Sequence, residues 1–309
     1  MKKIKKISLW IISTIAVLVV AGYLYWTFFA LKSIQLTDNI TLVHTSVFGK
    51  QLGANMVFEV NSGDVFMVDD QLAPFAKSIR KEISKHGGEN IKFIVNTHWH
   101  PDHSGGNAAL GENATIIAHS NAQRRFKEPQ KGFGLTAPDS YHEFPARPSD
   151  GWATETIDSI RVVQFHGQEI QIIPFANSHT DGDLVVYFKG EKVLCVGDLF
   201  WPDQLPYVDV YNKGNSIALS HSIDRLLDIV PDDVKIVTGH GPVSSKEDLI
   251  RYSKMIRETT NYVQDQMASN QSLEQIQNSA LPEVFTNWQS KLVPANVWVK
   301  MVYESIKGE

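Results

Sequence analysis

The sequence predicts an α/β fold, and two kinds of pattern carry this prediction. Short runs rich in β-branched and aromatic residues, such as residues 56–60, 91–95 and 115–118, are typical of buried strands. Between the strands lie amphipathic segments such as residues 74–86 and 217–229, whose apolar residues recur at helical spacing. The chain has 309 residues, of which 43% are hydrophobic and 20% are charged. This composition indicates a globular protein rather than a disordered one.

The first 36 residues predict a membrane anchor. Four lysines within residues 2–6 precede an uncharged run over residues 7–31. As a helix this run is about 37 Å long, enough to cross a hydrocarbon core of about 30 Å. Because positive residues stay cytoplasmic, we expect a single-pass helix in the inner membrane and the rest of the chain facing the periplasm or the outside. The alternative is a cleaved signal peptide, with small residues at 19–21, and a secreted protein.

Residues 37–271 are expected to form the globular domain, and residues 272–309 a helical extension. Residues 120–127 predict a short helix with a basic exposed face. Residues 128–150 are rich in Pro, Gly and polar residues, which predicts a long loop that is a candidate lid. The net charge is −5 and the pI about 6.1, so nucleic acid is not an expected partner. Nothing in the sequence indicates a protein partner.

The densest group of metal-ligand residues follows the strand at residues 91–95 and comprises His98, His100, Asp102 and His103. Imidazole and carboxylate groups bind zinc and related divalent ions. In an extended chain, residues i and i+2 point to one side, so His98 and His100 can hold one ion. Pro101 turns the chain, which lets Asp102 and His103 reach a second ion. Two neighbouring ions can share a bridging hydroxide.

Three later loops each place one more ligand-type residue after a predicted strand. These residues are His179, Asp198 and His240, and each lies beside small or polar residues. The single cysteine, Cys195, excludes an intrachain disulfide and a cysteine-based structural zinc site.

The pattern His-x-His-x-Asp-His at residues 98–103, with the later His179, Gly197-Asp198 and Gly239-His240-Gly241, resembles the metallo-β-lactamase superfamily over roughly residues 42–256. The resemblance implies a four-layer αββα sandwich with two metal ions at one edge. It assigns His98, His100 and His179 to one ion, Asp102, His103 and His240 to the other, and Asp198 as the bridge. It also makes Asp69, which ends a predicted strand, an acceptor that orients a ligand histidine.

The resemblance further implies a hydrolase that uses two zinc ions, with iron or manganese not excluded. Asp102 would bind metal and orient the bridging hydroxide during attack on a small-molecule ester, thioester, lactone or similar acyl bond. Zinc β-lactamases with a cysteine in the second site carry it where this chain has Asp198, which favours glyoxalase II-like branches. Cleavage of a β-lactam by a class B-like enzyme is the alternative. A non-catalytic, membrane-anchored metal-binding or docking module is the alternative of another class.

Overall fold

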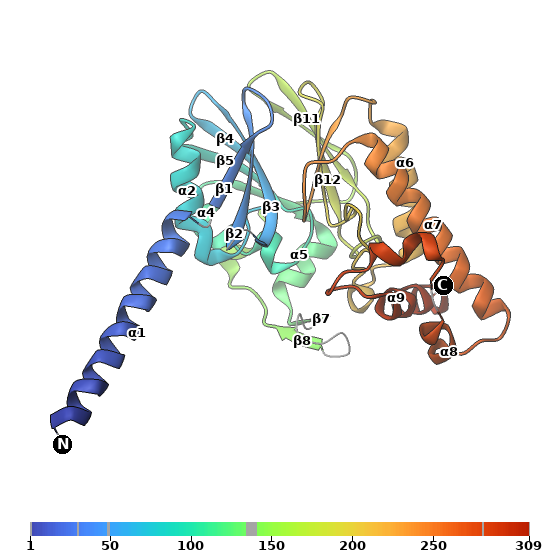
Figure 1. Cartoon of the computed structure of the whole chain (residues 1–309). Coiled ribbons are helices and arrows are strands. Elements are labelled where there is room, and N and C mark those ends of the chain that lie inside the picture. Colours follow the sequence, from blue (N-terminus) through green and yellow to red (C-terminus); the bar gives the residue numbers. More distant parts are fainter. Residues whose placement is uncertain (1, 30, 48–49, 134–140, 280, 309) are drawn as a thin grey trace.

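Two stacked β-sheets between layers of helices form the body of the protein (Figure 1). The computed structural model describes residues 2–29, 31–47, 50–133, 141–279 and 281–308. Within these residues the first sheet has seven strands in the order β1-β2-β3-β4-β5-β6-β9. Its strands are β1 (Leu31–Gln35), β2 (Ile40–Val47), β3 (Lys50–Asn61), β4 (Asp64–Val68), β5 (Asn90–Val95), β6 (Thr115–His119) and β9 (Glu155–Ile157).

The second sheet has five strands in the described part of the chain, in the order β10-β11-β12-β13-β14. Its strands are β10 (Arg161–Phe165), β11 (Gln168–Pro174), β12 (Leu184–Phe188), β13 (Val193–Gly197) and β14 (Lys235–Thr238). The core between the sheets contains Phe66, whose ring lies 5.8 Å from Phe165 and 5.7 Å from Phe188 in edge-on contacts. These offset aromatic contacts lock the two sheets face to face.

Helices cover both outer faces of the sandwich. Figure 1 shows α2 on one side and α6 and α7 on the other. The first sheet packs against α2 and α5, and the second against α6, α7 and α9. The helical elements are α2 (Ala76–Lys85), α3 (Pro101–Ser104), α4 (Asn107–Leu110), α5 (Ser120–Lys127), α6 (Ser216–Ile229), α7 (Lys246–Ala268), α8 (Leu273–Asn278) and α9 (Ala295–Lys307), with short 3₁₀ turns η1 (Ala73–Phe75), η2 (Ser149–Gly151), η3 (Val210–Asn212) and η4 (Glu283–Trp288). The expected αββα sandwich is confirmed.

The strand directions explain why ligand-type residues meet at one edge of the sandwich. In the first sheet β4 pairs with β5 in parallel, and in the second β13 pairs with β14 in parallel. Parallel neighbours end at the same edge of their sheet. The loops that follow these four strands carry Asp69, the segment from His98 to His103, Asp198 and His240.

The predicted transmembrane anchor is not supported. The helix itself is present as α1 (Lys2–Phe29), which extends away from the sandwich in Figure 1. Among the residues that the structure describes, however, no helix combines the length and apolar character needed to cross a membrane. The periplasmic location and the alternative of a cleaved signal peptide stay predictions.

The segment over residues 128–150 differs from the predicted long loop, because it contains two antiparallel strands, β7 (Gln130–Phe133) and β8 (Tyr141–Phe144). Residues 134–140 of the candidate lid lie outside the described residues. After β8, Arg147 donates to the carbonyl of Trp99 at 2.5 Å and to Ser104 Oγ at 2.8 Å. The segment therefore holds the loop that carries His98 and His103 in place through hydrogen bonds from Arg147.

The prediction of a basic exposed face on residues 120–127 is wrong for one of its cations. Arg125 is only 7% exposed, because its guanidinium binds the buried Asp181 through Nε and Nη2, both at 2.6 Å. A buried guanidinium of this kind needs a carboxylate partner to offset the loss of its hydration.

Candidate metal centre

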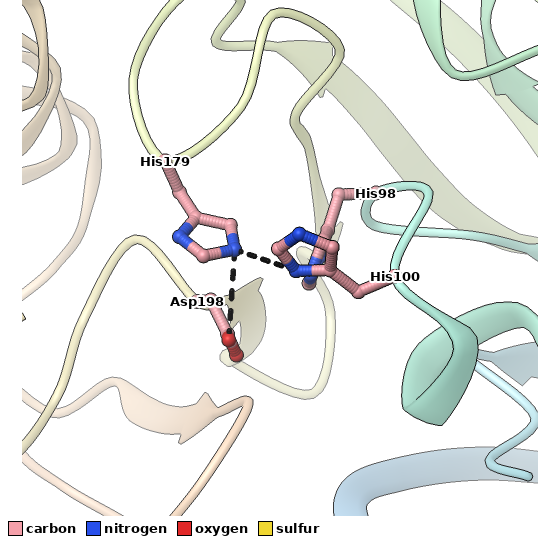
Figure 2. A group of neighbouring side chains, drawn as sticks. All are labelled: His98, His100, His179 and Asp198. Atoms are coloured by element: carbon pink, nitrogen blue, oxygen red, sulfur yellow. Dashed lines mark hydrogen bonds and ion pairs between the residues drawn. The ribbon is translucent and has the colours of Figure 1, made fainter. Parts of the chain in front are cut away.

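One group of donor atoms comes from two loops and the end of a strand. His98, His100, His179 and Asp198 each offer a ligand atom, and these atoms all lie within 4.8 Å of one another (Figure 2). His100 Nδ1 lies 2.9 Å from His98 Nε2 and 3.1 Å from His179 Nε2, and Asp198 Oδ2 lies 3.6 Å from His179 Nε2. Three ring nitrogens and one carboxylate oxygen around one point form a donor set that suits a zinc ion.

A second group consists of Asp102, His103 and His240, whose ligand atoms also lie within 4.8 Å of one another. Asp102 Oδ2 is 3.2 Å from His240 Nε2 and 3.8 Å from His103 Nε2. Asp198 faces this group with its other oxygen, because Oδ1 is 3.2 Å from His103 Nε2 and 3.6 Å from His240 Nε2. Asp198 thus presents one oxygen to each group, and the structure brings all seven residues together.

Outward hydrogen bonds orient four of the histidines so that one nitrogen of each faces inward. His98 Nδ1 lies 3.1 Å from Thr97 Oγ1, His103 Nδ1 lies 2.7 Å from Asp69 Oδ2, and His179 Nδ1 lies 2.8 Å from the carbonyl of Tyr207. His100 is turned the other way, with Nε2 2.9 Å from Asp209 Oδ2. Such outward partners fix the tautomer and ring angle of metal-binding histidines.

Asp69 is held in place by its own contacts and by an unusual backbone conformation. Its Oδ1 accepts from the Thr97 amide at 2.7 Å, and its Oδ2 accepts from Thr97 Oγ1 at 2.8 Å as well as from His103. Its φ of 60° lies in the left-handed region, which is rare for a residue with a side chain. Strain of this kind persists where the surroundings determine it, often at functional sites.

Two buried atoms of the site lie 3.2 Å apart but make no well-formed hydrogen bond with each other or with any other described residue, and this tests whether the site suits metal ions. These atoms are His103 Nε2 and Asp198 Oδ1. Buried polar atoms are nearly always satisfied, so an orphaned pair needs an explanation. Gly239 adds to the fit, because a Cβ at this position would collide with Asp198 Oδ1 and reach His103 Cε1 at 2.9 Å. The donor set and its orphaned atoms fit two divalent cations.

The electrostatics of the site divide its histidines into two kinds. Burial lowers the pKa of His98 well below its usual range and that of His179 to about 4. Burial also opposes a charge on His103 and His240, but Asp198 together with Asp102, and for His103 also Asp69, outweighs it and raises both pKa values. Conversely, burial would raise the pKa of Asp198, yet His240 and His103 hold it below its usual range.

The site is open on one side. The side chains of Asp102 and His240 are 31% and 24% exposed, and that of His100 is 12% exposed. The other ligand-type side chains are buried. Trp201 stacks on His240 with ring centroids 5.0 Å apart, so it forms one wall beside this opening. The exposed part of the site is therefore formed by Asp102, His240 and His100.

Asp209 and the carbonyl of Tyr207, which contact ligand histidines, were not predicted from the sequence. Both lie in the irregular stretch between Asp198 and α6, which has no period and no motif that could have identified them. Asn55, by contrast, holds the His240 loop, because its Nδ2 donates to the carbonyls of Thr238 at 2.8 Å and Gly241 at 3.0 Å.

Comparison with known proteins defines the class. The family model of the metallo-beta-lactamase superfamily matches residues 57–240, which is more than half of the chain. The protein belongs to the metallo-β-lactamase superfamily, and the resemblance found in the sequence is confirmed.

Particular relatives agree with this assignment. An uncharacterized protein of Aquifex aeolicus (strain VF5) is 26% identical over 192 residues, which cover 61% of this chain and 84% of that protein. A solved metallo-beta-lactamase from Pontibacter korlensis has a TM-score of 0.59 at 16% identity and covers 74% of this chain and 99% of its own. The structure of VMB-1 has a TM-score of 0.58 at 22% identity, and the match covers 73% of this chain and 96% of VMB-1. The structure of the DIM-1 metallo-beta-lactamase has a TM-score of 0.57 at 19% identity, and the match covers 74% of this chain and 97% of DIM-1. At these identities the solved structures show a shared fold.

Proposed function

We propose that the protein is a metal-dependent hydrolase that cleaves an ester, thioester, lactone or similar acyl bond of a small molecule. The observation that carries this proposal is the position of Asp198, whose two oxygens face the two donor groups separately. His98, His100 and His179 would hold one cation, Asp102, His103 and His240 would hold the other, and Asp198 would contribute to both. Zinc is the cation that a histidine-rich donor set of this kind favours.

When bound, the two ions supply an activated water near neutral pH and polarise the electrophilic oxygen of the substrate. The residues of the chain determine where that chemistry takes place. Asp102 is the most exposed of the ligand-type side chains and is held through Oδ2 by His240. It is thus the group best placed to accept a hydrogen bond from the attacking water and to orient it. Trp201 and the buried histidines limit access to one side, so a substrate reaches the site beside Asp102.

The test is a hydrolysis panel with the full chain loaded with zinc and a chelated control. The panel contains a thioester, a lactone, an aryl ester, a chromogenic β-lactam and a phosphodiester. We expect chelator-sensitive turnover of an acyl substrate. The variants Asp102→Ala and His179→Ala should lower kcat by at least about 100-fold, while Asp232→Ala, whose side chain is 94% exposed, should leave it unchanged. Near-full activity of the two site variants would rule this mechanism out.

The panel also separates the proposal from its alternatives. The β-lactam arm tests the reaction named for the solved structures of similar fold. A protein that binds two zinc ions but turns over no substrate would instead support the non-catalytic docking module, whose partner binding should survive chelation.

A further inference from the structure

A buried chain of hydrogen bonds runs from the ligand-type residue His100 to a helix on the outside of the first sheet. Asp209 Oδ2 lies 2.9 Å from His100 Nε2 and 2.7 Å from Asn212 Nδ2. Asn212 Oδ1 accepts from Arg125 Nη1. Arg125, in α5, binds Asp181 with Nε and Nη2. Asp181 lies two residues after His179, and its amide donates to the carbonyl of Asn212 at 3.1 Å.

Burial makes the bonds of this chain obligatory. Asp209, Asn212, Asp181 and Arg125 are 0%, 2%, 1% and 7% exposed. Water cannot replace a missing partner at such positions, and an unpaired buried polar group costs about 1–3 kcal/mol. Each member therefore holds its neighbour in one arrangement.

The donors and acceptors along this chain of hydrogen bonds can be arranged in only one way. A guanidinium can donate but never accept, so the amide oxygen of Asn212 must face Arg125. The NH₂ group of Asn212 then faces Asp209, whose carboxylate accepts. Asp209 in turn accepts the N–H of His100 Nε2, which leaves Nδ1 as the bare nitrogen. Nδ1 is the atom that faces His98 and His179.

The same network holds the base of the two-stranded sheet formed by β7 and β8. Arg125 Nη1 donates to Gln130 Oε1 at 2.8 Å, and Asn212 Nδ2 donates to the carbonyl of Lys131 at 2.6 Å. Arg125 thus joins three parts of the chain, namely α5, β7 and the stretch that precedes α6. A lysine has no planar fork and could not make these bonds together.

We propose that Arg125 is a positioning residue of the metal centre, which acts through Asn212 and Asp209 to hold His100 in the tautomer that presents Nδ1 to the site. This inference rests on the proposed function, because it gives the bare nitrogen a metal ion to bind. Outer partners of metal-binding histidines typically change metal affinity by 10- to 100-fold. Arg125 lies two hydrogen bonds further out than Asp209, so its effect belongs at the lower end of this range.

The primary test compares Arg125→Lys with a matched control, Arg124→Lys, in the full chain. Arg124 binds the same Asp181 at 2.9 Å and is 45% exposed, but among the described residues its hydrogen bond is with that carboxylate alone. Zinc affinity is measured by competition with a chromophoric chelator, and folding is checked by circular dichroism. We expect Arg125→Lys to lower the affinity for one of the two zinc ions by about tenfold. Arg124→Lys should change neither affinity by more than about twofold. Equal affinities in Arg125→Lys and the wild type would overturn the inference, even if the variant were less stable.

Asn212→Ala gives a second route if Arg125→Lys does not fold. This variant should lower the affinity for the same zinc ion, because it interrupts the hydrogen bonds between Arg125 and Asp209. In a double-mutant cycle, adding Arg125→Lys to Asp209→Asn should cause no further loss of affinity. Additive losses would show that Arg125 does not act through Asp209.

A metal-free measurement separates this inference from the proposed function. The ¹⁵N chemical shifts of the His100 ring in the chelated wild type should show a protonated Nε2 and a bare Nδ1, and this preference should be weakened in Arg125→Lys but not in Arg124→Lys. If the wild type binds no divalent ion, the proposed function fails while this readout still stands. If the wild type binds zinc but the ring shows the same tautomer in both variants, only the inference fails.

Discussion

Glu59 is a buried carboxylate far along β3 from the metal centre. Its side chain is 0% exposed, and neither oxygen has a hydrogen-bond partner among the described residues. Burial is the main cause that raises its pKa, Glu191 adds to the effect, and His166 opposes it, with a resulting pKa of about 7. The ionised form is therefore unfavourable in the folded protein.

This carboxylate makes stability depend on pH in a defined direction. Because the folded pKa of about 7 lies above the ordinary value of 4.5, the folded state binds the proton more tightly than the unfolded state. The stabilising effect is complete below pH 4.5 and is lost as the pH rises through 7. At about 1.4 kcal/mol per pKa unit, the loss is about 3 kcal/mol.

We predict that Glu59→Gln removes this dependence and leaves the protein more stable than the wild type above neutral pH. The free energy of unfolding is measured in urea between about pH 5 and pH 8, with chelator present so that metal binding does not contribute. Glu169→Gln is the control, because the Glu169 side chain is 43% exposed and pairs with Lys189 at the surface. An unchanged pH slope in Glu59→Gln would contradict the prediction.

Among the larger elements, the C-terminal segment supports the stretch that orients two ligand histidines. Leu205 N donates to the carbonyl of Trp288 at 2.7 Å, and Ser216 N donates to Ser305 Oγ at 3.0 Å. Between these two points lie the carbonyl of Tyr207 and the carboxylate of Asp209, which contact His179 and His100. The extension is thus part of the folded body, although its length and composition alone did not indicate such a role.

A substitution of Trp298 in α9 tests how strongly the C-terminal segment contributes to the free energy of unfolding. The side chain is 0% exposed and donates from Nε1 to Thr259 Oγ1 of α7 at 2.9 Å. We predict that Trp298→Ala lowers the free energy of unfolding by about 3–5 kcal/mol, measured by chemical denaturation. Val284→Ala in the same extension, at a side chain that is 67% exposed, should change it by less than about 0.5 kcal/mol. Similar small effects of both would show that the extension packs loosely.

At the scale of the whole molecule, ion binding and folding should be coupled. Seven buried or half-buried ligand-type groups meet only when both sheets are in place. An ion that binds the folded state but not the unfolded state stabilises the protein by about 4 kcal/mol when the free ion concentration is 1,000 times the Kd. We therefore predict a higher Tm with zinc than with chelator, measured by calorimetry at equal protein concentration.

The same coupling has a pH dependence whose sign follows from the histidines. The raised pKa values of His103 and His240 mean that both rings must lose protons before they can bind a cation. Acidification therefore favours release of the ion. The difference in Tm between zinc and chelator should shrink as the pH falls from about 8 to about 6, and a difference that grew on acidification would contradict this assignment of the second group.

Local patterns were sufficient to predict most strands of the two stacked sheets, the main helices and the side chains that could act as ligands, but not the strands β7 and β8. The α/β class followed from runs of β-branched and aromatic residues and from apolar residues at helical spacing, and His98, His100, Asp102 and His103 stood out because their spacing reflects the geometry of one short loop. The remaining ligand-type residues, His179, Asp198 and His240, were each visible only as polar residues after a strand. A superfamily resemblance was needed to connect them.

Only the tertiary structure decided which distant residues meet. The contact of His100 with Asp209 joins positions 109 residues apart, and that of Arg125 with Asn212 joins positions 87 residues apart. No spacing rule links such pairs, because their distance depends on how the sheets stack and where irregular segments cross the edge. Arg125 illustrates the difference: its neighbours in sequence predict an exposed helix face, whereas packing against Asp181 buries it. The period of a sequence reflects local backbone geometry, and the partners of a buried charge are set by packing between layers.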